Sequence, residues 1–234
     1  KELLSLQHLL SKPEHHDELL FIIIHQAYEL WFKLILKDLE MAIERMESIE
    51  VLSARKSVYR SVVIMRVLVQ QIHILETMRP ADFLKFRSNL NPASGFQSLQ
   101  FRELEFILGI KERKYLRFFK NNAEATAQLE KRLDGPDLRS TFYKMLGKLG
   151  IALPEDAHLI PLDEKSEQGE QLIAALAPIY QKPEENLELY LLTEALLDLD
   201  HQLGLWRFHH VTVVERLIGN KIGTGGSSGV GYLM

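Results

Sequence analysis

The sequence predicts an all-α protein. Apolar residues recur at the three-to-four-residue spacing of helices over most of the 234 residues, and no stretch alternates with the two-residue period of a half-buried strand. Proline and glycine stand at breaks between the periodic segments, where helices are expected to end. Since 46% of the residues are hydrophobic, the chain can bury a substantial core. We therefore expect a single all-α domain over residues 1–234, built from long bundled helices.

The longest predicted helices lie near the two ends of the chain. The first is expected to open with Ser11-Lys12-Pro13-Glu14, a capping box with proline in the first turn, and to continue to about Met46. Such a helix, roughly 50 Å long, is too long for a small compact domain alone, so bundle packing or contacts between subunits are expected. The other predicted elements are a helix over 53–78, a short helix over 81–88, a turn at 91–95, a helix over 96–110, shorter helices on either side of Gly135-Pro136, a surface loop or mobile hairpin over 154–169, and a helix over 185–218 that ends at Gly219.

Composition narrows the function classes. The 28 basic and 32 acidic side chains leave a net charge of −4, which argues against a nucleic-acid-binding protein. The absence of cysteine excludes disulfides, zinc–thiolate sites, iron–sulfur clusters and thiolate nucleophiles, and it fits a reducing cytoplasm. No uninterrupted apolar run is longer than Leu19–Ile24, which is far shorter than the ~20 residues of a membrane span. The start at Lys1 and the apolar ending at Met234 predict a chain trimmed at both ends.

His210 is the first candidate site residue. On a helix it lies on one apolar stripe with Leu203, Trp206, Val213, Val214 and Leu217. An imidazole in such a stripe must satisfy two ring nitrogens, and a metal on one with a hydrogen bond on the other would do so. From periodicity alone, a hydrogen-bonded core histidine and a metal ligand both remain open. His209 is the poorer candidate, because its face also takes in Gln202, Thr212 and Arg216.

His25 is the second candidate. It lies in the middle of the first predicted helix, one turn after Phe21 and Ile22, and near neutral pH it could donate, accept or carry a proton. A histidine at a seam between helices explains the position equally well. Four further histidines have no partner at a recognisable spacing and are expected to be structural or exposed: His8, His73, His158 and His201. His15 and His16 lie beside acidic residues in the first turn of the first predicted helix, where a solvated capping region is expected.

Two further segments could bind a ligand. Arg87 lies near a predicted turn and helix start, and its guanidinium suits a carboxylate held by two parallel hydrogen bonds, although a surface ion pair would explain it equally. Residues 223–231 carry five glycines in nine positions but lack the Lys-Ser/Thr ending of a phosphate loop. They are either a flexible linker or a loop that orders over a bound ligand.

Three segments resemble the tryptophan 2,3-dioxygenase family in order, and they span nearly the whole chain apart from weaker similarity over 112–190. They are HHDELLFIIIHQAYELWFK from His15, FRSNLNPASGFQSLQFRELEF from Phe86, and LWRFHHVTVVERLIG from Leu205 followed by GTGGSSGVGYL from Gly223. The resemblance implies a helical fold of the haem tryptophan/indoleamine dioxygenase type, with haem b as cofactor. It implies insertion of both atoms of O₂ across the C2–C3 bond of L-tryptophan's indole ring, which gives N-formyl-L-kynurenine and opens the kynurenine pathway. It further implies a cytoplasmic homotetramer, a dimer of dimers, with no membrane or nucleic-acid partner.

The resemblance also assigns roles by motif position. His210 would be the axial ligand of the haem iron, and His25 would be catalytic and face the indole N–H. The residues that would bind the substrate are Phe21, Ile22, Ile23, Ile24, His25, Phe83, Arg87 and Thr224, and those on the oxygen side of the haem are Ser94 and Gly95.

The sequence departs from the family pattern in two places. Phe83 falls where some members have a tyrosine that helps to bind the substrate carboxylate, so that group is expected to depend more on Arg87. The family also has tyrosines that reach into a neighbouring subunit's pocket. They lie just before the segment that begins here at Lys1, so the sequence given does not contain them.

Three other functions remain open. The chain could be a dioxygenase of the same fold acting on another indole, a haem-based sensor or carrier without turnover, or a helical interaction module without a cofactor. A comparison of indole substrates separates the first, and an absorption spectrum after haem reconstitution separates the last.

Overall fold

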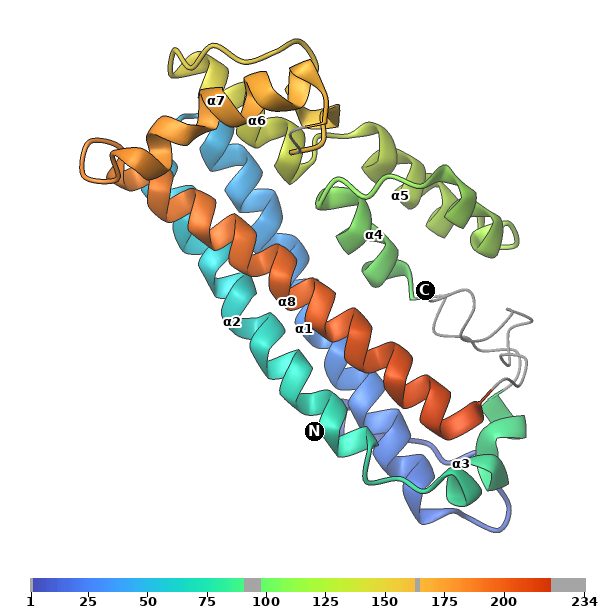
Figure 1. Cartoon of the computed structure of the whole chain (residues 1–234). Coiled ribbons are helices and arrows are strands. Elements are labelled where there is room, and N and C mark those ends of the chain that lie inside the picture. Colours follow the sequence, from blue (N-terminus) through green and yellow to red (C-terminus); the bar gives the residue numbers. More distant parts are fainter. Residues whose placement is uncertain (1, 91–97, 163–164, 220–234) are drawn as a thin grey trace. The chain divides into compact units, whose positions relative to one another are not determined.

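The computed structural model describes residues 2–90, 98–162 and 165–219 (Figure 1). Within these ranges the chain forms helices and no strand, which confirms the all-α prediction. The α-helices are α1 (His16–Glu47), α2 (Val51–Leu75), α3 (Pro80–Phe86), α4 (Leu99–Ile107), α5 (Ala123–Asp134), α6 (Leu138–Lys148), α7 (Glu167–Gln181) and α8 (Leu187–Ile218). The 3₁₀ helices are η1 (Glu2–Ser5), η2 (Arg87–Leu90), η4 (Arg113–Phe119) and η5 (Ala157–Leu159).

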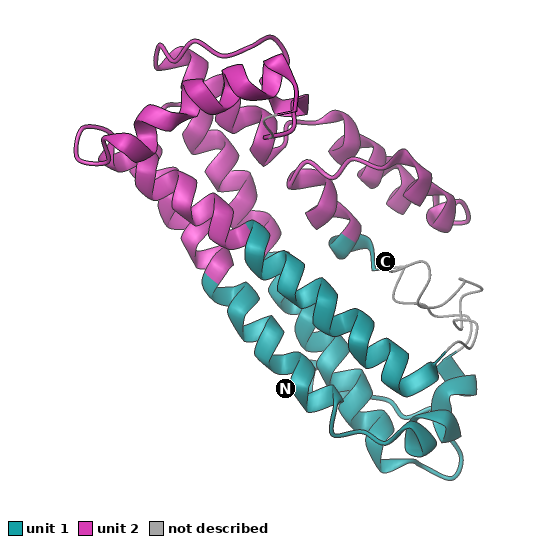
Figure 2. Ribbon diagram, viewed as in Figure 1, with its two compact units in different colours: residues 1–34, 63–101, 200–234 teal, residues 35–62, 102–199 magenta. Residues whose placement is uncertain are grey.

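The chain divides into two compact units (Figure 2). Unit 1 comprises residues 1–34, 63–101 and 200–234, and unit 2 comprises residues 35–62 and 102–199. The long helices α1, α2 and α8 therefore contribute residues to both units. The expectation of one domain over the whole chain stays a prediction.

The start of α1 differs from the expected one. α1 begins at His16 and not at Ser11. The carboxylate of Glu18 accepts hydrogen bonds from the backbone N–H of Leu10 (2.8 Å) and of Ser11 (3.2 Å), and Ser11 Oγ accepts one from the N–H of His15 (3.1 Å). Because these bonds hold the preceding segment outside the helix, the prediction of a proline in the first turn is wrong.

Three other helix boundaries, two starts and one end, depend on local residues. Pro136 does not begin a helix, because Asp137 caps α6 one residue later. The segment over 154–169 is not only a surface loop, since Ala157 and Ile160 are buried and α7 begins at Glu167. Past the end of α8, Gly219 adopts a φ of +55°, as expected of a glycine that ends a helix.

Helices α1 and α2 are each long and apolar enough, by length and composition, to cross a membrane. Both also supply side chains to a core: Ile35 and Leu39 of α1 and Val58 and Val62 of α2 are fully buried. A core helix of a water-soluble protein has the same composition, so this property alone indicates little about a membrane.

Asp137 ties two elements of unit 2 together, and its loss is expected to be costly. Its Oδ1 accepts the N–H of Ser140 (2.8 Å), its Oδ2 lies 3.0 Å from Lys111 Nζ, and the residue is only 7% exposed. We expect Asp137→Ala to lower the free energy of unfolding by about 2 kcal/mol, because a buried N–H loses its cap. Urea denaturation followed by circular dichroism measures this. Asp137→Asn keeps an oxygen for the cap and should lose less; equal losses in the two variants would contradict the capping role.

Candidate active site

His210 of α8 lies in unit 1 among apolar and aromatic side chains. Its ring stacks on Trp206, one helical turn earlier, with centroids 5.2 Å apart and an interplanar angle of 4°. Of the predicted apolar stripe, Leu203, Trp206, Val213 and Leu217 are buried and Val214 is half-buried. The half-buried His210 ring makes no hydrogen bond to any residue that the structure describes.

The electrostatic environment of His210 favours a neutral ring. Burial, together with the nearby ring of His25, lowers the pKa of His210 from 6.5 to about 4. At neutral pH the imidazole therefore has an unshared electron pair on one nitrogen, as a metal ligand requires.

Trp206 is itself held by aromatic side chains from two other helices of unit 1. Its ring centroid lies 5.9 Å from Tyr28 and 5.9 Å from Phe32 on α1, both in edge-to-face geometry, and 5.0 Å from Phe101 on α4. Such contacts restrict the tryptophan to one rotamer. Because His210 stacks on Trp206, this cluster also fixes the plane of the histidine ring.

His25 of α1 has a defined tautomer when neutral. Its Nδ1 lies 2.7 Å from the backbone oxygen of Phe21, and a carbonyl oxygen can only accept, so Nδ1 carries the proton. The pKa of His25 is lowered, because the effect of burial exceeds the opposite effects of the Phe21 carbonyl and of the charge on Glu29. The neutral ring thus presents Nε2 as a hydrogen-bond acceptor.

The structure brings three of the predicted substrate residues together in unit 1. The ring of Phe21 lies 4.0 Å from that of His25 and 5.6 Å from that of Phe83 on α3, centroid to centroid. Phe86, buried one turn after Phe83, lies 5.9 Å from Phe21. Arg87 follows directly as the first residue of η2, and its N–H donates to the Phe83 carbonyl. The packing of α3 on α1 therefore fixes the position of the Arg87 backbone.

Residues 21–25 do not all lie on one face of α1. Phe21, Ile24 and His25 share a face, because they are separated by three and four residues, and Ile24 is buried. Ile23 points elsewhere, with 46% of its surface exposed. Roles for Ile22 and Ile23 in a substrate pocket stay predictions.

Sequence reasoning missed Glu29, which connects α1 to the start of α4. Glu29 accepts hydrogen bonds from Ser98 Oγ (2.6 Å) and from Gln100 Nε2 (2.7 Å), and Gln100 Nε2 also lies 2.9 Å from the Glu29 carbonyl oxygen. Ser98 Oγ in turn accepts the N–H of Phe101 (3.1 Å). Ser98 stands three residues before Phe101, which is the spacing of a serine that caps the start of a helix, so the sequence did contain a signal for the start of α4.

The remaining site predictions fall outside the described residues. These are Ser94 and Gly95 on the proposed oxygen side, Thr224 at the amino-acid end of the substrate, and the glycine-rich segment 223–231. Their roles stay predictions.

The low pKa of His210 predicts that the stability of the chain depends on pH. Below pH 6.5 the unfolded chain binds a proton at this ring, whereas the folded chain does so only near pH 4, so the free energy of unfolding falls as the pH is lowered between these values. We expect a loss of about 2 to 3 kcal/mol from this group. His210→Leu should flatten the profile of melting temperature against pH, whereas His201→Gln, at an exposed position of α8, should leave it unchanged. Identical profiles for wild type and His210→Leu would contradict a buried neutral ring.

The comparisons with known proteins agree on one family. Residues 1–148 and 161–234 match the sequence model of the family described as tryptophan 2,3-dioxygenase. The protein of that name from Xanthomonas oryzae pv. oryzae (strain PXO99A) is 42% identical over 232 residues, which cover 99% of this chain and 78% of the relative. The protein of the same name from Xanthomonas campestris pv. campestris (strain B100) is 41% identical with the same coverage. That from Serratia proteamaculans (strain 568) is 39% identical over 232 residues, which cover 99% of this chain and 83% of the relative. The similarity extends over residues of both units.

Proposed function

Since the chain belongs to the tryptophan 2,3-dioxygenase family, we propose that it inserts both atoms of O₂ across the C2–C3 bond of the indole ring of L-tryptophan and releases N-formyl-L-kynurenine. The observation that carries the proposal is the placement of two imidazoles on one aromatic cluster of unit 1: the ring of His25 contacts Tyr28, and Tyr28 contacts Trp206, on which His210 stacks. His210 has an unshared electron pair that a metal ion could use, and His25 Nε2 can accept a hydrogen bond from the substrate. Both lie in segments that match the family.

The residues present fit haem b as the cofactor. An axial ligand must offer a neutral nitrogen, and the ring of His210 is neutral and without a hydrogen bond inside the described part of the chain. Its apolar and aromatic neighbours, Leu203, Trp206 and Val213, suit a flat hydrophobic macrocycle. His210 would hold the iron, and the bound haem would supply the activation of O₂.

The protein's own part in the reaction is to orient the substrate and exclude water. His25 Nε2 would accept the indole N–H, because Nδ1 is engaged by the Phe21 carbonyl. Phe21 and Phe83 would line an apolar wall, and Arg87 and Thr224 would hold the carboxylate and the amino group. Fixing both ends of a substrate in this way lowers a barrier by several kcal/mol. Closure of residues 223–231 over the substrate would exclude water.

A substrate without the indole N–H tests the role of His25. We expect His25→Ala to lower kcat/KM for L-tryptophan about 10- to 100-fold, because the donor loses its acceptor. The same substitution should change kcat/KM for 1-methyl-L-tryptophan far less, since that substrate has no N–H to donate. Steady-state kinetics on both substrates measure this. Equal losses would assign His25 to packing and not to the N–H.

One assay tests the proposed function as a whole. The chain, reconstituted with haem and kept reduced with ascorbate, should convert L-tryptophan to N-formylkynurenine, followed by its absorbance. Turnover of D-tryptophan, tryptamine and 2-methylindole should be much slower, because these lack a correctly placed carboxylate. A Soret band without turnover would favour a haem sensor or carrier, and no Soret band would favour an interaction module.

We also propose that residues 1–234 act as one domain in a cytoplasmic homotetramer, a dimer of dimers, without membrane or nucleic-acid partners. An apolar stripe on α1 supports contacts between subunits: Leu19, Ile23, Leu30 and Leu34 lie on one helical face and are all exposed. Light scattering after size exclusion measures the assembly. Replacing Ile23 and Leu30 together with glutamate should reduce the mass, and a monomeric wild type would contradict the proposal.

A further inference from the structure

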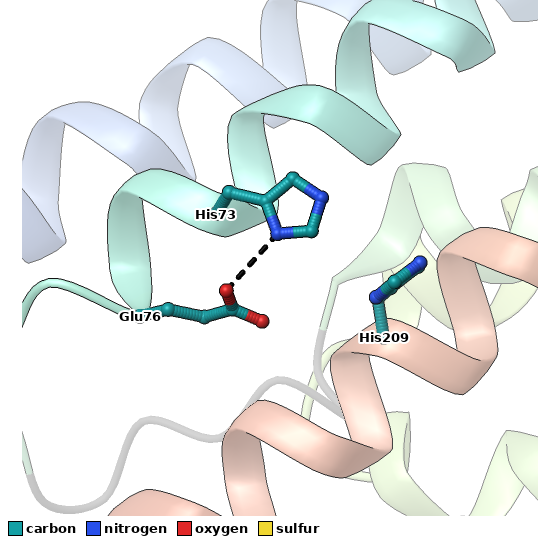
Figure 3. Close-up of side chains that lie close together, drawn as sticks. All are labelled: His73, Glu76 and His209. Carbon is teal, nitrogen blue, oxygen red and sulfur yellow. Dashed lines mark hydrogen bonds and ion pairs between the residues drawn. The ribbon is translucent and has the colours of Figure 1, made fainter.

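Three potential metal ligands, His73, Glu76 and His209, meet in unit 1 (Figure 3). His73 lies near the end of α2, Glu76 follows that helix, and His209 lies on α8. His73 Nδ1 is 3.0 Å from Glu76 Oε2, and the two histidine rings lie 5.1 Å apart at an angle of 77°. One nitrogen or oxygen from each residue falls within 4.8 Å of the others.

We propose that His73, Glu76 and His209 bind a divalent transition-metal ion such as Zn²⁺. Two imidazoles and one carboxylate form a ligand set that suits zinc, and ligand distances near 2.0–2.2 Å would require the three side chains to close by only about 1 Å. His73 and Glu76 have 44% and 31% of their side-chain surface exposed, so both can rotate and a water can complete the coordination.

The pairing of His73 with Glu76 alone does not account for the cluster. That pair is three residues apart on one segment and would form without any other partner. His209 comes from a different helix, yet its ring approaches the His73 ring edge-on beside the carboxylate. The expectation that His73 has no partner at a recognisable spacing is wrong, because Glu76 stands three residues later on the same segment. The second partner, His209, lies more than 130 residues away in sequence.

The site is separate from the proposed haem ligand although the two histidines are neighbours in sequence. Successive residues of a helix point about 100° apart. His210 accordingly stacks on Trp206, whereas His209 contacts His73. The inference does not depend on the proposed dioxygenase activity, and an ion here would link α2 to α8 within unit 1.

Zn²⁺ titration of the full chain by calorimetry tests the proposal. We expect one ion per chain, and a rise in melting temperature of about 5 to 10 °C at a hundredfold excess over Kd. His73→Gln and His209→Gln should each weaken binding at least about 10-fold. The matched control is His16→Gln, which removes an exposed histidine beside a single carboxylate, Asp17, and should leave the titration unchanged.

A further variant separates this inference from the proposed function. His210→Phe should retain Zn²⁺ binding even where haem binding is lost, and the melting temperature of each metal-free variant reports whether it is folded. Folded His73→Gln and His209→Gln variants that bind Zn²⁺ as tightly as wild type would overturn the proposal, as would an equal loss in His16→Gln. Co²⁺ provides a second readout: ligand-field bands of a four- or five-coordinate ion are expected in the wild type and not in the two variants.

Discussion

Replacement of His210 by alanine is expected to abolish stoichiometric haem binding and dioxygenase turnover together. In the haem-free fold this ring is neutral, stacked on Trp206 and without a hydrogen bond to any described side chain, so one of its ring nitrogens is available to the iron. Loss of a residue that only supports a metal ligand costs up to about 100-fold in affinity or activity, and loss of the ligand itself should exceed this. Soret absorbance after reconstitution and the rate of N-formylkynurenine formation measure the two effects.

Two controls distinguish loss of a ligand from loss of the fold. His209→Gln removes the neighbouring imidazole and should retain the Soret band, because that ring faces His73 and not Trp206. Free imidazole added to His210→Ala should restore part of the absorbance by entering the cavity that the substitution leaves. Full haem binding by His210→Ala, or its loss in His209→Gln alone, would show that the iron ligand has been wrongly assigned.

Replacement of Arg87 by alanine should have the next largest effect, on KM for L-tryptophan. A guanidinium that holds a carboxylate by two charge-assisted hydrogen bonds contributes about 2 to 3 kcal/mol, so KM should rise about 30- to 150-fold while kcat changes less. Phe83 has no hydroxyl that could share the carboxylate, so the proposed role would depend more heavily on Arg87. Steady-state kinetics across a wide range of L-tryptophan concentrations measure the effect.

The substrate analogue tryptamine and the variant Arg87→Lys sharpen this test. Tryptamine lacks the carboxylate, so its kcat/KM should be nearly the same in wild type and Arg87→Ala. Arg87→Lys keeps the charge but not the planar pair of donors, and it should recover only part of the lost affinity. An unchanged KM for L-tryptophan in Arg87→Ala would remove the carboxylate role.

Local periodicity was enough to predict the surroundings of His210. The stripe of Leu203, Trp206, Val213 and Leu217 follows from the geometry of one helix, and each of these residues is buried as expected. By contrast, the contacts of Trp206 with Tyr28 and Phe101, and those of Glu29 with Ser98, join segments distant in sequence. No helical period contains that information, so the proximity of His25 to His210 was expected only from the family resemblance.

The helical segments that escaped prediction include α7 and η4, each for a local reason. α7 contains Pro178 within an otherwise periodic segment, and a proline there is normally taken to end a helix. Its start, where Ser166 Oγ accepts the N–H of Gly169 (3.0 Å), does follow the usual capping chemistry. η4 is a 3₁₀ helix with three residues per turn, so it lacks the period that identifies an α-helix.

Phe86 and Ser98 both contact α1, and together they anchor the stretch of chain between α3 and α4. Phe86 packs on Phe21, and Ser98 is bonded to Glu29 two helical turns further along the same helix. The stretch between them is therefore delimited by two fixed points on a single rigid element. His25 lies between these two points on α1. The contacts that anchor both ends of the stretch therefore flank the turns of α1 that carry the histidine proposed to accept the indole N–H.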